Sequence, residues 1–188
     1  GHPVVAVAPV SVDLTFALKR ITKHLQRSRR EKLVTQAPDF YLQHLHITES
    51  YDQLQGCALV IECTLENLDI KKSVYSKIEA VIDKNALLAS NTSAIPISIL
   101  QQQTTHPSRF FGLHWAEPSH TTRFLEVICG NESDIAKGEY LYELSHLWGK
   151  EPTLVRKDIR GFITNRIMYA MYREAISLVE QGYATVED

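Results

Sequence analysis

The sequence contains few cysteines, and their positions argue against a metal site. Only Cys57, Cys63 and Cys129 occur among 188 residues. No two of them have the spacing of metal ligands, and Cys57 and Cys63 lie in an apolar run. This pattern predicts reduced, buried thiols in an intracellular protein, with no metal centre.

Long apolar runs and a strong charge of either sign are also missing. No apolar run approaches about 20 residues, so we expect no membrane span, and no secretory signal is visible. A formal net charge of −2 gives no reason to expect nucleic acid or an anionic membrane as a partner. The one basic cluster, residues 27–32, is either the solvated end of a helix or a seat for a phosphate-bearing ligand.

Short apolar runs alternate with amphipathic segments along the chain. Strands are predicted at residues 4–8, 45–48, 58–61, 86–90, 110–114, 124–128 and 152–155. Helical spacing of apolar residues covers residues 14–32, 68–82 and 135–148, and Ser11 or Asp13 can cap the first of these helices. Strands that alternate with helices of ten or more residues predict a doubly wound α/β sheet.

A last helical pattern opens at Gly161 and ends near Gly182. It follows the final predicted strand, so we place a domain boundary near residues 158–161. The prediction is one α/β domain over residues 1–158 and the start of a helical domain over residues 159–188. Alone, this helix would have to pack on the sheet domain or on a neighbouring chain.

One histidine stands at the end of an apolar run, before a proline that turns the chain. His114 precedes Pro118, and a second apolar run then returns with Glu126 at its centre. A carboxylate on a returning strand can fix the tautomer of a histidine and make it a better base. The alternative is an ordinary hairpin with a solvated glutamate and an incidental histidine.

Several linked motifs resemble the 3-hydroxyacyl-CoA dehydrogenase family. They are Ser90-Asn-Thr-Ser93, His114-Trp-Ala-Glu-Pro118, Leu125-Glu-Val127, Gly161-Phe-Ile-Thr-Asn-Arg166 and the block from Ile61 to Lys71. The resemblance runs from Gly1 to Asp188 in the family's order. It covers only the middle of a family member.

The resemblance implies an incomplete Rossmann-type sheet followed by the first helix of an all-α domain. It also implies NAD-dependent oxidation of a 3-hydroxyacyl-CoA thioester, such as 3-hydroxybutyryl-CoA, in fatty acid β-oxidation. His114 would be the general base and Glu126 the group that orients it. The full-length protein would be a cytoplasmic homodimer that binds an acyl-CoA substrate.

The resemblance assigns further roles to polar residues at strand ends and helix starts. Ser93 would hold the substrate oxygen, although it could equally cap the helix that opens near Pro96. Asn165 would approach the substrate from the second domain, or is an ordinary polar residue of an amphipathic helix. Glu66 and Lys71 would contact the cofactor, or are solvated charges near a helix start. Asn91 and Ser93 share the loop expected at the cofactor site.

The sequence departs from the family where the cofactor should bind. It has no G-x-G-x-x-G turn for a pyrophosphate. Ala8 stands where the family has an aspartate for the ribose hydroxyls, and Glu117 replaces an asparagine that serves cofactor or substrate. Glu117 cannot donate when ionised, and a second negative charge near His114 should raise the pKa of the histidine unless Arg123 or His120 neutralises it.

Two explanations for these departures stay open. A first strand–helix unit has been lost or removed from a longer protein, or the chain is a natural relative that no longer binds NAD in the family's manner. In both, we expect NAD binding by this chain to be weak or absent. The functional alternative to the dehydrogenase is a non-catalytic, acyl-CoA-binding or structural relative.

Overall fold

Seven strands form two separate sheets in the computed structural model, which describes residues 2–8 and 10–188 without the side chains of residues 11 and 12. The smaller sheet pairs β1 (Val4–Val7) with β2 (Leu45–Thr48) in parallel. The larger has the order β3-β4-β5-β6-β7. Its strands are β3 (Leu59–Glu62), β4 (Leu87–Ser90), β5 (Phe110–Trp115), β6 (Phe124–Cys129) and β7 (Glu151–Val155). All seven predicted strands are confirmed, but the single sheet that they predicted is divided between β1 and β3.

Neighbouring strands of the larger sheet run parallel, except that β5 and β6 are antiparallel. β5 therefore ends where β6 begins, and the turn between them lies at the carboxyl edge of β3, β4 and β5. Open α/β sheets bind their ligands at this edge.

The four longer helices follow the predicted order, and α4 opens after Pro96 as expected. The helices are α1 (Ser11–Arg30), α2 (Pro38–Leu42), α3 (Leu68–Glu79), α4 (Ile97–Gln101), α5 (Ile135–Leu147) and α6 (Thr164–Glu180), with short 3₁₀ turns at Tyr51–Leu54 and Pro107–Arg109. Side chains cap α3 and α5, because Asn67 accepts from Ile70 N and Asp134 accepts from Ala136 N. Of the two caps expected for α1, the Ser11 side chain lies outside the described residues, and Asp13 stands in the first turn.

Two apolar cores cover the two faces of the larger sheet. Successive residues of β5 point to opposite faces, so Phe110 joins the core beneath α3 and α4, and Phe111 joins the core beneath α5. Gly112 lies between them, where a Cβ atom would come within 3.0 Å of Ile97 and Ile128 side chains. This close packing fixes β5, and with it the residues at its end.

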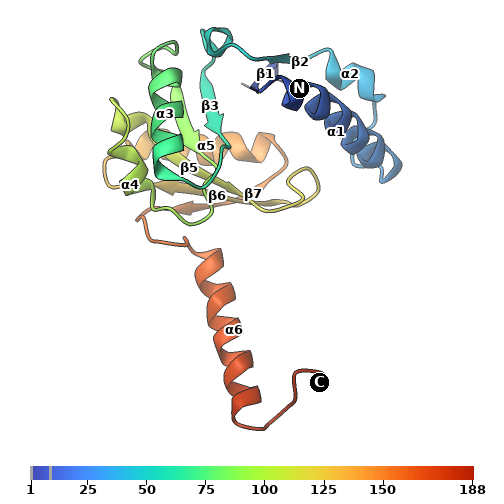
Figure 1. The fold of residues 1–188 in the computed structure, drawn as a ribbon, viewed down its shortest axis with the longest axis vertical. Coiled ribbons are helices and arrows are strands. Elements are labelled where there is room, and N and C mark those ends of the chain that lie inside the picture. Colours follow the sequence, from blue (N-terminus) through green and yellow to red (C-terminus); the bar gives the residue numbers. More distant parts are fainter. Residues whose placement is uncertain (1, 9) are drawn as a thin grey trace.

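Helix α6 projects away from the sheets, as Figure 1 shows. None of its residues is buried, and Ile167, Met171 and Ile176 are exposed. Of the two alternatives expected for α6, packing on the sheet domain is therefore wrong for the single chain, and packing on a neighbouring chain stays a prediction. Among the described residues, hydrogen bonds from this helix to the sheet domain come from its first turn and from the residue just before it.

The cysteines only partly follow the prediction of buried thiols. All three are free, but Cys63 is exposed, Cys57 is half-buried and only Cys129 is buried. In the described part of the chain, no helix is long and apolar enough to cross a membrane. Residues 2–8 and 10–188 also hold no group of three or more potential metal ligands.

Candidate active site

The centre of the site is a contact between His114 and Glu126. Antiparallel pairing of β5 with β6 sets the two residues directly opposite each other. Their side chains lie on one face of the sheet, with His114 Nδ1 2.7 Å from Glu126 Oε2. His114 is 6% exposed and Glu126 is fully buried. The predicted contact is confirmed, and the alternative of a solvated glutamate is wrong.

The second oxygen of Glu126 binds the backbone ahead of and within α6. Ile163 N and Thr164 N each donate to Glu126 Oε1 at 3.0 Å. Burial raises the pKa of Glu126, but hydrogen bonds from His114 and from these two amides outweigh burial and bring the pKa below its ordinary value. An ionised carboxylate accepts the Nδ1–H proton of His114, which leaves Nε2 as the basic nitrogen.

Two aromatic rings flank the histidine. The Phe124 ring meets the His114 ring edge-on at 5.7 Å, and the Phe162 ring lies at 5.4 Å. Phe162 is fully buried and has a φ of 51°, directly after Gly161 with a φ of 75°. Sequence reasoning missed this role of Phe162, since a left-handed phenylalanine has no local sequence signal. The turn at Gly161 and Phe162 thus sets an apolar ring against the imidazole and shields that side of it from water.

The loop after β4 is held by Glu66. Its Oε1 atom accepts from the Thr92 hydroxyl and from the amides of Ser93 at 3.1 Å and Ala94 at 3.2 Å. From the other side, Asn165 Nδ2 donates to the Ser93 carbonyl at 2.8 Å. The structure thus brings Glu66, Ser93 and Asn165 together and leaves Ser93 exposed. Ser93 does not cap α4, whose N-cap is Pro96.

A buried ion pair lies beneath that loop. Lys71 Nζ is 2.9 and 3.0 Å from the two oxygens of Glu62, and 3.5 Å from Glu66 Oε2. Lys71 is 1% exposed, so the expectation of a solvated charge is wrong for this residue. The hydroxyls of Tyr75 and Ser90 donate to Glu62 Oε2 as well, at 3.0 and 2.7 Å.

Sequence reasoning did not single out Glu62, although it is a carboxylate at the end of an otherwise apolar strand. Burial raises the pKa of Glu62, but hydrogen bonds from Thr64, Ser90 and Lys71 lower it below the ordinary value. The ionised Glu62 therefore holds Lys71 in place. Lys71 in turn faces the carboxylate of Glu66, which accepts hydrogen bonds from the loop of Ser93.

The remaining predicted residues lie at the rim. The side chain of Asn91 accepts from Trp115 N at 3.2 Å and so joins the ends of β4 and β5. Glu117 is exposed. The two residues expected to neutralise the Glu117 charge have other contacts: Arg123 pairs with Glu151, and the His120 ring contacts the His24 ring.

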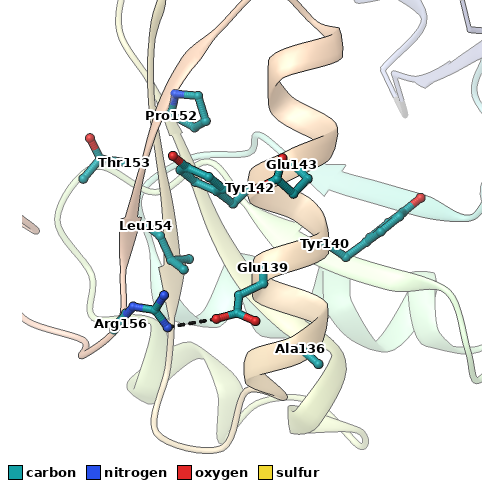
Figure 2. Close-up of a pocket in the computed structure, with 9 residues that line it drawn as sticks. All are labelled: Ala136, Glu139, Tyr140, Tyr142, Glu143, Pro152, Thr153, Leu154 and Arg156. Atoms are coloured by element: carbon teal, nitrogen blue, oxygen red, sulfur yellow. Dashed lines mark hydrogen bonds and ion pairs between the residues drawn. The ribbon is translucent and has the colours of Figure 1, made fainter.

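A separate surface pocket of about 800 Å³ lies between α5 and β7. Figure 2 shows the Arg156–Glu139 ion pair across it, with Tyr142 beside Leu154 and Pro152. None of the predicted site residues lines this pocket.

A parallel-dominated α/β sheet binds its ligands at its carboxyl edge, and here that edge carries a buried histidine–carboxylate pair of the kind that acts as a general base. Together they indicate an enzyme of the Rossmann-like α/β class. The comparison with family models gives the particular family. Residues 1–159 match the model "3-hydroxyacyl-CoA dehydrogenase, NAD binding domain", and residues 161–188 match the C-terminal domain of the same family. The chain belongs to the 3-hydroxyacyl-CoA dehydrogenase family.

Individual relatives agree with this assignment. The 3-hydroxybutyryl-CoA dehydrogenase of Bradyrhizobium diazoefficiens is 34% identical over 97% of this chain and 63% of its own length. The 5-formyl-3-hydroxy-2-methylpyridine 4-carboxylate 5-dehydrogenase of Mesorhizobium japonicum is 40% identical over 73% of this chain and 44% of its own length. The crystal structure of Mycobacterium tuberculosis FadB2 superposes with a TM-score of 0.91 at 32% identity, over 100% of this chain and 67% of that one. The chain thus spans between about two fifths and two thirds of the length of these relatives.

Proposed function

We propose that the protein carrying these residues oxidises the 3-hydroxyl group of an acyl-CoA thioester, with NAD as the hydride acceptor. The observation that carries the proposal is the buried contact between His114 Nδ1 and Glu126. The names of the relatives support an oxidoreductase of this family, and they give no support to the non-catalytic alternative.

In the proposed reaction, His114 Nε2 takes the proton of the substrate hydroxyl. Glu126 keeps the Nδ1–H proton in place and stabilises the imidazolium that forms. In the reverse direction, the imidazolium protonates the developing alkoxide. The rings of Phe124 and Phe162 limit water around the imidazole, so the positive charge is stabilised mainly by the fixed carboxylate.

Two polar groups are assigned to the substrate side. We assign the exposed Ser93 hydroxyl to the substrate oxygen, since Glu66 and Asn165 hold its backbone from both sides. Asn165 belongs to the segment 159–188, which we propose as the start of a helical domain. The homodimer, the cytoplasmic location and the role in β-oxidation rest on the resemblance alone and stay predictions.

The described residues fit only part of an NAD site. The loop that follows β4, with Asn91 and Ser93, lies at the carboxyl edge of the sheet near Glu66, and we assign it to the nicotinamide end of the cofactor. At the end of β1, however, Ala8 offers no acceptor for ribose hydroxyls, and the sequence has no glycine-rich turn for the pyrophosphate. We therefore derive the proton chemistry of His114 and Glu126 and no cofactor geometry.

The test is an assay of the gene product that carries these residues, with 3-hydroxybutyryl-CoA and NAD, following NADH formation. His114→Asn should lower kcat by about 100- to 10,000-fold, the usual contribution of a general base. His106→Asn is the matched control, because His106 is exposed and lies outside the site. No activity in the unsubstituted protein, or equal activity in the two variants, would refute the assignment.

A second substrate class is favoured by one observation. The relative that is 40% identical is named for a formyl-pyridine carboxylate, a small aromatic aldehyde rather than a thioester. The same base could act on the hydrate of an aldehyde, which also carries a hydroxyl beside the carbon that gives up hydride. Running the assay in parallel with this aldehyde separates the two classes, since the variant His114→Asn should abolish whichever activity is present.

A further inference from the structure

The turn between β5 and β6 joins the strands that carry His114 and Glu126. It covers residues 116–123, directly after Trp115 and directly before Phe124. The Phe124 ring packs edge-on against the His114 ring at 5.7 Å. The position of this turn therefore decides where one aromatic wall of the site stands.

One ammonium group fastens the turn from the inside. Lys150 lies directly ahead of β7 and is 7% exposed, and its Nζ atom donates to the carbonyls of Ser119 and Thr122. These carbonyls are three residues apart, so a single cation draws the backbone of the turn onto the start of β7. The backbone beside it adds one bond, from Glu151 N to the Arg123 carbonyl at 2.7 Å.

The other contacts of the turn are local or lie at the surface. The amides of Thr121 and Thr122 donate to the Pro118 carbonyl at 3.0 and 3.1 Å. On the outer side, the exposed His120 ring contacts the His24 ring of α1. These contacts hold the turn to itself and to α1, whereas Lys150 and its neighbour attach it to the larger sheet.

The Lys150 ammonium is buried without an acidic partner. In the described part of the chain no carboxylate forms an ion pair with it, since the adjacent Glu151 pairs with Arg123, and burial lowers the pKa of Lys150. The Trp115 ring lies 5.0 Å from Nζ and stacks on Trp148. Lysine is rarely buried unless it is paired, and here two carbonyls and an aromatic face take the place of a carboxylate.

We propose that Lys150 is a positioning residue of the site: its ammonium fixes the turn of residues 116–123 and so keeps Phe124 against the ring of His114. Its part in the reaction rests on the proposed function, whereas its hold on the turn does not. Without the ammonium, the two turn carbonyls lose a charged donor, and the turn loosens from β7. The Phe124 ring then no longer shields the imidazole, and the base loses part of its fixed geometry.

Hydrogen exchange of this chain gives the first test. Lys150→Met keeps an apolar side chain of similar length but removes the ammonium, so the amides of Thr121 and Thr122 should exchange at least about tenfold faster. The Leu87 amide, at the amino end of β4, should not change. Lys84→Met is the matched control, because Lys84 is exposed, and it should change none of these amides. Unchanged exchange of the two threonine amides in Lys150→Met would overturn the proposal.

A measurement on the unsubstituted chain covers the case in which Lys150→Met does not fold. Nitrogen NMR of the lysine side chains follows the exchange of their ammonium protons. Those of Lys150, which are buried and hydrogen-bonded, should exchange more slowly than those of Lys84. Equally fast exchange at the two lysines would overturn the proposal.

The ring signals of His114 test the positioning role in the same chain. In Lys150→Met these signals should move, because the Phe124 ring moves with the turn. Ile82→Ala is the stability control: Ile82 is buried and follows α3 at the amino edge of the sheet, so this variant should lower the urea midpoint and leave the His114 signals in place. Unmoved His114 signals in folded Lys150→Met would make Lys150 a structural residue only and refute the positioning role.

Kinetics of the gene product that carries these residues complete the design. Lys150→Met should lower kcat by about 10- to 100-fold and change KM little, because a misplaced base slows the reaction without weakening binding. A fall in kcat no larger than that in Ile82→Ala, or an effect on KM alone, would overturn the proposal. If the unsubstituted protein is inactive, the proposed function fails, and amide exchange and the His114 signals still decide the role of Lys150.

Discussion

Replacing Glu126 with glutamine should reverse the tautomer of His114. The two oxygens of Glu126 accept three hydrogen bonds, from His114 Nδ1 at 2.7 Å and from Ile163 N and Thr164 N at 3.0 Å each. A glutamine has one oxygen and one NH₂ group, so it cannot accept from all three donors. If its oxygen keeps the two backbone amides, its NH₂ group faces Nδ1, which must then accept, and the imidazole proton moves to Nε2.

The expected fall in kcat follows from the loss of Nε2 of His114 as the proton acceptor. With Nε2 protonated, His114 cannot take a proton from the substrate in the proposed geometry, so kcat should fall by about 100- to 10,000-fold. Stability should change less in Glu126→Gln than in Glu126→Ala. The alanine leaves all three donors without an acceptor in a buried site, which should cost about 3–5 kcal/mol in the free energy of unfolding.

Nitrogen NMR of the histidine ring and urea unfolding provide the assay. In the unsubstituted chain Nδ1 should carry the proton at neutral pH, and in Glu126→Gln the proton should be on Nε2. The urea midpoint ranks the three proteins in stability. The reasoning is refuted if the glutamine variant keeps the proton on Nδ1, or if its kcat in the full gene product stays within about threefold of the unsubstituted value.

Other predictions concern the charges around the site. The pKa values of Glu62 and Glu126 are lowered from the ordinary 4.5. The stability that the two ionised carboxylates add is therefore complete above about pH 4.5 and is lost as the pH falls through the lowered values. Urea midpoints measured from pH 6 to pH 3 should decline, and a flat profile would contradict the lowered pKa values. Lys71→Met leaves Glu62 buried without its cation and should cost about 3–5 kcal/mol of unfolding free energy, of which the added change Glu62→Gln should restore a large part. This chain should not bind NADH measurably by calorimetry, given Ala8 and the missing glycine turn, and a micromolar dissociation constant would disprove that. Glu117→Asn should leave the acidic limb of the rate profile in place, because Glu117 is exposed and its charge is screened; a clear shift of that limb would place Glu117 beside the base.

Much of the fold follows from local pattern. Seven short apolar runs predict the strands within one or two residues, because buried parallel strands must be apolar on both faces. The pairing of His114 with Glu126 also follows from sequence, since the proline turn between two apolar runs leaves few registers for an antiparallel pair. Helices α3 and α5 begin after the capping residues Asn67 and Asp134, and Gly149, with a φ of 73°, follows the carboxyl end of α5.

Contacts between distant segments needed the tertiary structure. The sequence alone determined that β5 brings a histidine to a strand end and that a glutamate returns opposite it. It could not determine that Glu126 also binds the amides of residues 163 and 164, because that contact depends on where α6 begins in space. Nor could it show that Lys71 is buried on Glu62, since a charge near a helix start is solvated unless another strand end happens to cover it. The division of the sheet between β1 and β3 was likewise decided by the tertiary structure, because strand pairing joins segments that lie far apart in the sequence.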